Sequence, residues 1–202
     1  TTVADFFQPA VAVIKHTNPC GLAVHENIAE AYRRAFAGDP VSAFGGIVAF
    51  NRSVTAEAAQ AMGSVFYEVV IAPGYEPDAL SVLQKKRNLR ILAVDPVQEA
   101  HGEVTQKAAL EVRQISGGLL LQTPDELHED PTAWETMTER QPTSQELEDM
   151  AFAWKACKHI KSNAIVLAKG NALLGMGAGQ PNRVNSVQLA IQAAGEGASG
   201  SV

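Results

Sequence analysis

The sequence has few cysteines, few basic residues and no long apolar run. Its two cysteines, Cys20 and Cys157, show neither the spacing of a metal-binding pair nor a secreted disulfide pattern, which favours a reducing cytoplasm. The longest apolar runs, such as 69–72 and 119–121, fall far below the roughly 18 residues of a membrane span. Sixteen Lys and Arg against 22 Asp and Glu give a net charge of −6, the opposite of what sequence-independent nucleic-acid binding requires. We therefore expect a cytoplasmic protein that binds neither a membrane nor nucleic acid.

What the sequence does contain is typical of a compact α/β domain. Hydrophobic residues make up 46% of the 202 residues and charged residues 19%, which is enough apolar surface for a core without disulfides. Polar stretches with proline and glycine predict loops at 16–21 and 39–46. Strands are predicted at 10–15, 47–50, 68–72 and 90–94, and helices at 27–38, 55–66 and 77–83. Strands that alternate with helices at this spacing indicate an α/β layered fold.

A change of pattern follows in the last third of the chain. Residues 122–142 are polar, acidic and aperiodic, and we interpret them as a long connection. Thr143 and Glu146 then form the capping box of a helix. The predicted buried stripe of that helix consists of Leu147, Met150, Ala151, Trp154 and Cys157.

The sequence after this helix predicts a hairpin and one more helix. Gly170-Asn171 is a two-residue turn signal between apolar runs at 165–169 and 172–176. The glycine-rich segment 175–183 leads into the last helix. The predicted buried face of this helix consists of Val184, Val187, Ile191 and Ala194. Residues 195–202 are small and predicted to be flexible, and we interpret the end of the chain as a truncation.

Lys15 and His16 stand where a predicted buried strand meets a loop. At neutral pH a histidine can accept a proton while a neighbouring lysine supplies positive charge, so the pair suits acid–base chemistry. The alternative is a solvated strand end followed by a histidine that hydrogen-bonds within the loop. The spacing alone leaves both interpretations open.

The glycine-rich segment and Ser162-Asn163 also permit two interpretations. Backbone N–H groups at the start of a helix attract anions, and Arg183 could clamp one. The spacing matches neither the phosphate-loop nor the dinucleotide pattern, so a structural turn is the alternative. Asn163 could present its amide to a ligand or satisfy backbone groups in a turn.

Metal and thiol chemistry find little support in the sequence. Pro19-Cys20 is followed by Ala23 where a zinc deaminase would need its second cysteine. Neither cysteine has a neighbour that would activate its thiol, so we expect both to be structural. We therefore predict no metal site.

Six separated segments together resemble one enzyme family. They are VIKHTNPCG (13–21), DPVSAFGGIVAFNR (39–52), FYEVVIAPGYE (66–76), GGLLLQ (117–122), KSNAIVLAK (161–169) and GMGAGQPNR (175–183). Their content and order resemble AICAR transformylase, the C-terminal domain of the bifunctional purine-biosynthesis enzyme that also carries IMP cyclohydrolase. The resemblance covers nearly all 202 residues. It implies transfer of a formyl group from the co-substrate 10-formyltetrahydrofolate to the 5-amino group of AICAR, giving FAICAR.

The resemblance also implies roles for individual residues. His16 matches the proton acceptor, and Lys15 matches the lysine that stabilises the transition state. Asn163 matches the asparagine that holds the carboxamide of AICAR and orients the reacting groups. The remaining matches are Gly45, Glu68 and Arg183 for AICAR, and Phe44 and Val184 for the folate.

For the fold, the resemblance implies two cytidine-deaminase-like α/β subdomains and a homodimer with active sites at its interface. We expect a first subdomain at 1–121, the acidic connection at 122–142 and the start of a second subdomain at 143–202. Members often hold a structural potassium ion near 157–164, where this sequence reproduces the side-chain pattern only in part. The cyclohydrolase domain and the family's outer ligand-contact segments have no counterpart in this sequence. The alternative to a formyltransferase is therefore a non-catalytic AICAR-binding or dimerisation fragment, whereas a deaminase would need the zinc ligands.

Overall fold

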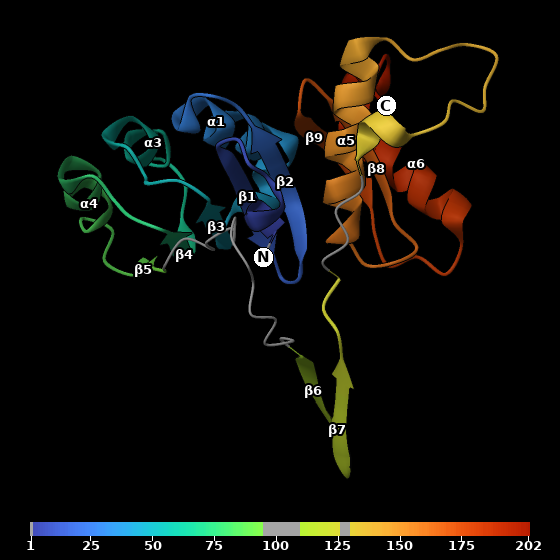
Figure 1. Ribbon diagram of the computed structural model, residues 1–202. Helices are drawn as coiled ribbons and strands as arrows, with labels where there is room; N and C mark the ends of the chain where they lie inside the picture. Colours follow the sequence, from blue (N-terminus) through green and yellow to red (C-terminus); the bar gives the residue numbers. More distant parts are fainter. Residues whose placement is uncertain (1, 95–109, 126–129) are drawn as a thin grey trace. The chain divides into compact units, whose positions relative to one another are not determined.

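The computed structural model describes residues 2–94, 110–125 and 130–202 (Figure 1). These residues form two compact units, one of residues 2–94 and 138–202 and one of residues 110–125 and 130–137. The first unit is a seven-stranded mixed sheet with helices on both faces, which confirms the predicted α/β layered class. No helix in the described ranges is long and apolar enough to cross a membrane.

The strands of the sheet are β1 (Ala10–Lys15), β2 (Asn18–Val24), β3 (Gly46–Phe50), β4 (Tyr67–Ala72), β5 (Arg90–Ala93), β8 (Ile165–Lys169) and β9 (Ala172–Gly177). Their order across the sheet is β5-β4-β3-β1-β2-β9-β8. β3, β4 and β5 are parallel to one another, and the other neighbouring pairs are antiparallel. Strands from the first and last parts of the sequence therefore share one sheet.

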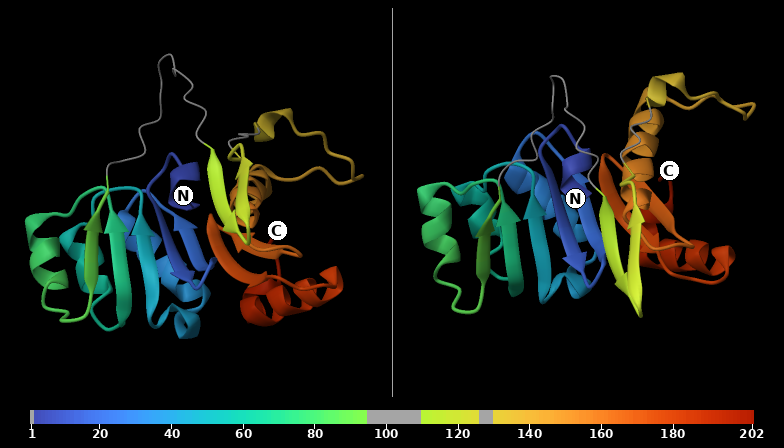
Figure 2. Two further views of the ribbon diagram at one scale, coloured as in Figure 1. Left: turned by 90° about the horizontal axis from the view of Figure 1, so that it is seen from below. Right: turned by 60° about the horizontal axis from the view of Figure 1, so that its bottom comes forward.

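Helices cover both faces of this sheet. The helices are α1 (Ile28–Gly38), α2 (Pro40–Ala43), α3 (Ala56–Ala61), α4 (Pro77–Leu83), α5 (Ser144–Lys158) and α6 (Arg183–Ala194), with the 3-10 helix η1 (Thr2–Asp5). α1, α3 and α4 pack on the face that carries Val13 and Val48, and α5 packs with η1 on the face that carries Ala12 and Leu22. α5 and α6 lie on opposite sides of β8 and β9 (Figure 2).

Local signals fix most of these elements where the sequence predicted them. Asn27 caps α1 by accepting hydrogen bonds from the N–H groups of Ala29 and Glu30, and Thr143 with Glu146 forms the predicted capping box. The hairpin turn at Gly170-Asn171 has positive φ at both residues, as a tight hairpin turn requires. The strands predicted at 10–15, 47–50, 68–72, 90–94, 165–169 and 172–176 are confirmed to within one residue at each end.

The predicted loop at 16–21 is wrong, because β2 already begins at Asn18. Only His16 and Thr17 form the turn, since Lys15 pairs with Asn18. Pro19 lies in β2 beside a register shift. The regular ladder of hydrogen bonds is interrupted there, so the strand can contain a proline.

Two further boundaries differ from the prediction. The expected loop at 39–46 contains α2, which starts because the Asp39 side chain accepts a hydrogen bond from Ser42 N and Pro40 occupies the first turn. The helix expected to reach Phe66 ends at Ala61, and the backbone N–H of Met62 closes it.

The buried face of α5 is not the predicted stripe. Asp149, Phe152 and Ala156 are buried, whereas Trp154 is 58% exposed and Cys157 is half-buried rather than part of the core. The Asp149 carboxylate accepts a hydrogen bond of 2.8 Å from Asn171 N, which turns this side of the helix toward the β8–β9 hairpin.

The face of α6 that was predicted to be buried is also wrong. Ser186 and Ala190 are buried, and Val184, Val187 and Ile191 are exposed. A methyl group at Gly177 would lie 2.0 Å from the carbonyl oxygen of Ser186, so glycine lets the helix backbone approach the strand. Small residues therefore form this contact in place of the large apolar ones.

The end of the chain is ordered rather than flexible. Gly195–Ala198 forms the 3-10 helix η3. Val202 exchanges two backbone hydrogen bonds of 2.9 and 3.0 Å with Ala168 on β8.

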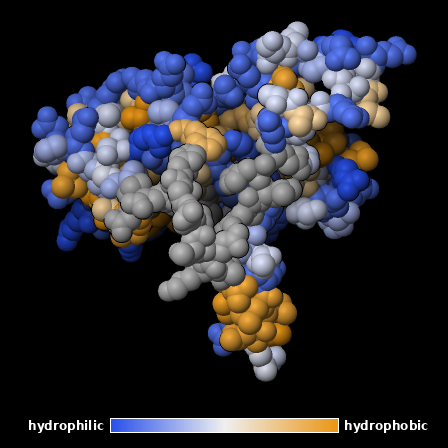
Figure 3. Space-filling model, viewed as in Figure 1, coloured by the Kyte–Doolittle hydropathy of each residue, from blue (hydrophilic) through white to orange (hydrophobic). Residues whose placement is uncertain are grey.

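The second unit contains a hairpin that the sequence analysis did not predict. Its strands are β6 (Glu111–Ile115) and β7 (Gly118–Gln122), and the 3-10 helix η2 (Pro131–Ala133) follows. Apolar side chains gather on this hairpin, where Leu119, Leu120 and Leu121 are exposed (Figure 3). Residues 126–129 of the predicted acidic connection lie outside the described residues.

Candidate functional site

The eight residues singled out by the resemblance all come from one end of the seven-stranded sheet. β1 ends where β3 begins, because these strands are antiparallel with Ile14 opposite Ile47. β4 begins beside β3, and β8 begins where β9 ends. The residues at this end are Lys15, His16, Phe44, Gly45, Glu68, Asn163, Arg183 and Val184.

Lys15 and His16 form the tip of the β1–β2 hairpin. Lys15 is the last residue of β1, and its ammonium group donates a hydrogen bond to the carbonyl of Phe44. An ammonium group has three donors, and the described residues occupy one of them. His16 is exposed and has φ +57°, in the left-handed region that histidine enters more often than most residues. Within the described residues its imidazole has neither a hydrogen bond nor an ion pair, which leaves both ring nitrogens open.

Phe44 and Gly45 connect α2 to β3. Gly45 has φ +68°, and its N–H donates a hydrogen bond of 2.8 Å to the carbonyl of Phe66. A methyl group at Gly45 would lie 3.4 Å from the Lys15 ammonium, so glycine keeps the space beside this cation open. The ring of Phe44 is 62% exposed and packs at 5.4 Å, centroid to centroid, against Phe66. The pair presents an aromatic surface beside the lysine.

Glu68 lies on β4 and is exposed. Its carboxylate accepts a 2.7 Å hydrogen bond from Arg90 on β5. Both side chains line a surface depression of about 450 Å³, together with Phe66 and Arg87. Glu68 is therefore accessible to a ligand, although one of its oxygens already has a cationic partner.

Asn163 and Arg183 lie together near the start of β8, at the same end of the sheet. Asn163 precedes β8, and its amide donates hydrogen bonds to the carbonyls of Gln180 (2.9 Å) and Pro181 (3.1 Å). The amide oxygen accepts from Arg183 at 3.4 Å. Val184, the next residue of α6, is 62% exposed. The Asn163 amide therefore satisfies backbone carbonyls, as expected for a structural role in a turn, and it also orients the exposed Arg183.

The Asn18 side chain links the segment that carries Asn163 to the turn at His16. Four strands separate Glu68 on β4 from the start of β8, a span of about 24 Å at roughly 4.8 Å per strand. Within that span the Asn18 side chain, two residues after His16, accepts a 3.2 Å hydrogen bond from Lys161 N. Ser186 donates a 2.8 Å bond to the carbonyl of Asn163. The sequence analysis missed both residues, because their partners are 143 and 23 positions away.

Most of the glycine-rich segment is explained by packing. Gly175 and Gly177 belong to β9, where methyl groups would collide with the backbone of α6. Only Gly179, with φ +65°, lies in the loop itself. Asn182 caps α6 by accepting a hydrogen bond of 2.9 Å from Val184 N. These observations favour the structural interpretation for the first two glycines.

Cys20, at this end of the sheet, is buried, which agrees with the structural role expected for it. Burial and, to a smaller extent, the nearby Asp39 carboxylate together raise the pKa of the Cys20 thiol to about 11. Its sulfur donates to the carbonyl of Val13 at 3.4 Å. A thiol held protonated in this way is a poor nucleophile. In the described ranges no three His, Cys, Asp or Glu side chains are grouped in a way that could hold a metal ion.

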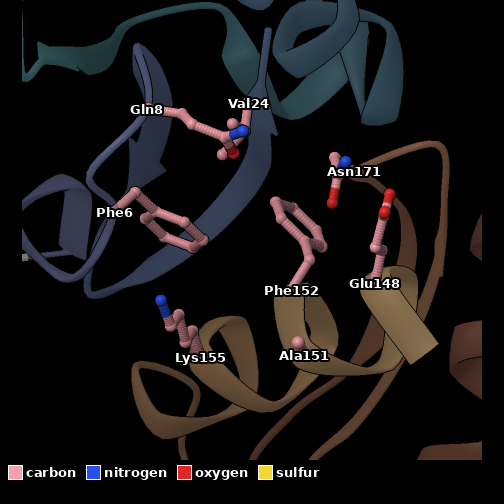
Figure 4. A pocket seen from close by; sticks show the side chains of 8 residues that line it. All are labelled: Phe6, Gln8, Val24, Glu148, Ala151, Phe152, Lys155 and Asn171. Atoms are coloured by element: carbon pink, nitrogen blue, oxygen red, sulfur yellow. The ribbon is translucent and has the colours of Figure 1, made fainter. Parts of the chain in front are cut away.

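A separate pocket lies at the opposite end of the sheet (Figure 4). It has a volume of about 320 Å³ and lies between α5 and the segment that joins η1 to β1. The ammonium group of Lys155 lies 5.5 Å from the ring centroid of Phe6 in this pocket, a cation–π contact. None of the eight predicted residues lines it.

Comparison with known proteins identifies the family of this chain. The family model for the AICARFT/IMPCHase bienzyme matches residues 1–193. The chain belongs to the AICARFT/IMPCHase bienzyme family. This confirms the resemblance inferred from the six sequence segments.

Curated relatives of this bienzyme family are named bifunctional purine biosynthesis protein PurH. The protein from Desulfitobacterium hafniense (strain DSM 10664 / DCB-2) is 50% identical over 198 residues, which cover 98% of this chain and 37% of the relative. The Myxococcus xanthus protein is 51% identical over 193 residues, and the Dictyostelium discoideum protein is 49% identical over 208 residues. The chain thus spans less than two fifths of the length of these relatives.

Proposed function

We propose that this sheet end carries the formyl-transfer chemistry of purine biosynthesis. In this proposal a formyl group passes from 10-formyltetrahydrofolate to the 5-amino group of AICAR, giving FAICAR. The observation that supports it most is that the Lys15-His16 turn and the Asn163–Arg183 group lie at one end of the sheet and are joined through Asn18. Membership of the bienzyme family supports the same activity.

His16 is the proton acceptor in this mechanism. The amine of AICAR is conjugated with its ring and is a weak nucleophile, so removal of its proton by a base assists its attack on the formyl carbon. The bond from that carbon to N10 of the folate then breaks, and N10 takes up a proton as tetrahydrofolate leaves. The open imidazole at the exposed turn suits this task. The Lys15 ammonium, held by the Phe44 carbonyl, places positive charge where negative charge develops on the formyl oxygen.

The other residues position the two substrates. Asn163 and Arg183 bind the carboxamide and the nucleotide of AICAR, and Gly45 with Glu68 completes its contacts on the other side. Phe44 and Val184, both 62% exposed, offer apolar surface to the folate. Hydrogen bonds described above orient Lys15, Glu68 and the Asn163–Arg183 pair for these contacts.

The wider expectations of the family form part of the same proposal. We infer a cytidine-deaminase-like arrangement for the α/β sheet, a homodimer and a cytoplasmic location.

The test is AICAR-dependent release of tetrahydrofolate from 10-formyltetrahydrofolate, measured on the protein as its gene encodes it. His16→Ala should lower kcat by about 10²-fold or more, which is the usual contribution of a positioned base. His25→Ala is the matched control, because His25 follows β2 at the opposite end of the sheet, and it should retain activity.

Calorimetric titration with AICAR separates this proposal from its alternative. Binding without turnover in the unmodified protein would identify the non-catalytic AICAR-binding fragment. Turnover that is unchanged in His16→Ala would exclude His16 as the proton acceptor.

A further inference from the structure

Lys86 lies in the turn after α4 and reaches across to the end of α3, which lies beside α4 (Figure 1). Its ammonium group donates hydrogen bonds to the carbonyls of Met62 (2.9 Å), Gly63 (3.0 Å) and Val65 (2.7 Å). These bonds use all three of its donors. Among the described residues no carboxylate acts on Lys86, and partial burial lowers its pKa below the usual 10.5. The charge of Lys86 therefore serves these three carbonyls.

The backbone of Lys86 is itself fixed. Its N–H donates a hydrogen bond of 3.0 Å to the carbonyl of Leu83, and its carbonyl accepts one of 3.1 Å from Leu89 N. Leu83 is fully buried, and Leu89 packs against the same core. The ammonium group therefore acts from a rigid base on segment 62–66, which joins α3 to β4.

The bond from Lys86 to Val65 fixes the orientation of Phe66. The carbonyl of Val65 and the N–H of Phe66 belong to one planar peptide unit, so a hydrogen bond to the carbonyl holds the whole plane. The ring of Phe66 is held as well, because it packs against Phe44 at 5.4 Å between ring centroids. The carbonyl of Phe66 then accepts the 2.8 Å hydrogen bond from Gly45 N.

A second peptide unit connects Phe66 to Lys15. The N–H of Gly45 lies in one plane with the carbonyl of Phe44, and that carbonyl accepts the hydrogen bond of the Lys15 ammonium group. In the described part of the chain this carbonyl is the one hydrogen-bond partner of the Lys15 side chain. A shift of Phe66 therefore moves the Phe44 carbonyl, and the Lys15 ammonium group moves with it.

We propose that Lys86 is a positioning residue that fixes the location of the Lys15 ammonium group. The inference rests on the proposed formyl transfer, in which Lys15 faces the negative charge that develops on the formyl oxygen. The connecting bonds lie within residues 15–86 of one chain, so they depend on no contact with the segment before β8. A misplacement of about 1 Å at a reacting centre can cost about 10²-fold in rate.

The experiment compares Lys86→Met with Lys85→Met in the protein as its gene encodes it. Methionine keeps much of the side-chain length but removes the three donors. Lys86→Met should lower kcat about 10- to 100-fold and change KM for AICAR and for 10-formyltetrahydrofolate less than threefold. The reason is that Lys15 acts on charge present in the transition state rather than on substrate binding. Lys86→Arg supplies new donors for the carbonyls and should recover most of the lost kcat.

Lys85→Met is the matched control. Lys85 is exposed in the same turn, and within the described ranges its side chain makes neither a hydrogen bond nor an ion pair. The substitution removes the same charge one residue away, so this variant should behave like the unmodified protein.

Combination with Lys15→Met separates positioning from a merely structural role. If Lys86 acts through Lys15, Lys86→Met has no further effect on kcat when Lys15 is already replaced. A residue that only caps α3 would lower the melting temperature and leave kcat of the folded protein unchanged, or lower kcat by the same factor in both backgrounds. Either result would overturn the inference. If Lys86→Met does not fold, Lys86→Gln, which keeps two donors, takes its place in the same comparison.

The outcomes also separate this inference from the proposed function. Full activity in Lys86→Met, while His16→Ala and Lys15→Met are inactive, would overturn the inference and leave the formyl transfer standing. An unmodified protein without formyl transfer would instead refute the proposed function, and this inference with it.

Discussion

Replacing Gly177 with alanine tests whether the close contact between β9 and α6 holds the site in place. The added methyl group would lie 2.0 Å from the Ser186 carbonyl oxygen, whereas ordinary contact begins at 3.4 Å. The helix must therefore move by about 1 Å, and overpacking of this kind costs about 1–3 kcal/mol. For a chain of this size each kcal/mol lowers the melting temperature by about 2–4 °C, so we expect a decrease of about 2–12 °C.

The same displacement of α6 should also lower the rate of the proposed formyl transfer. Ser186 holds the backbone of Asn163, and Arg183 begins the helix that would move. We expect Gly177→Ala to lower kcat about 10²-fold at a temperature where the variant is still folded. Circular dichroism melting and the tetrahydrofolate-release assay measure the two effects.

Gly197→Ala is the matched control for this substitution. Its methyl group would lie 3.4 Å from Leu174 Cδ1, an ordinary contact, so the variant should match the unmodified protein. If Gly177→Ala melts and turns over like the unmodified protein, the close approach of α6 does not position the site, and the reasoning fails.

Two further predictions concern ionisable groups. Burial raises the pKa of Asp5, but its bonds to His159 (2.8 Å) and Lys158 (3.2 Å) outweigh this effect and leave the pKa below 3.8. Because the folded-state pKa is depressed, Asp5 stabilises the fold above pH 3.8 and loses this effect as the pH falls through the folded-state pKa. Urea midpoints of Asp5→Asn should therefore lie below those of the unmodified protein at pH 6 and approach them near pH 3; a constant difference would contradict the assignment. For Cys20, a pKa of about 11 against the usual 9.0 means about 100-fold less thiolate, so iodoacetamide at pH 8 should label it only after unfolding. Mass spectrometry of the native protein would contradict this if Cys20 were labelled as fast as a free thiol.

Sequence reasoning succeeded where a short stretch of chain determines its own structure. Asn27 and Thr143 cap helices through bonds to residues two or three positions away, and Gly170-Asn171 sets its hairpin by its own backbone angles. Such signals depend on no distant partner. The strands β1, β3, β4, β5, β8 and β9 could be located in the same way, because apolar β-prone runs identify them, whereas β2, β6 and β7 were missed.

The errors arose where a distant segment decides the outcome. Pro19 and Gly21 are typical of loops, but both lie in β2. Position 21 is glycine because a methyl group there would meet the Ala35 carbonyl on α1 at 1.9 Å. Ser186 is buried because glycines on β9 admit the helix, a match that no periodicity within α6 reveals.

For the candidate site, the motifs proposed the residues but not their arrangement. Their meeting at one sheet end follows from the strand order, which places β9 beside β2, and β8 beside β9, across a large separation in sequence. The bond between Asn18 and Lys161 depends on the same order and was therefore invisible to sequence reasoning.

The single pairing of Ala23 with Ala172 has a consequence for how the protein folds. These residues are 149 positions apart in sequence, whereas the β1–β2 and β8–β9 hairpins close turns of two residues. Closing a long loop costs more entropy than closing a short one, and contacts between distant residues slow folding. The hairpins therefore form early, and β2 meets β9 late. Before that last step each group of candidate residues is already in its own hairpin or loop, but the two have not met, so we expect the candidate site to be assembled at the end of folding.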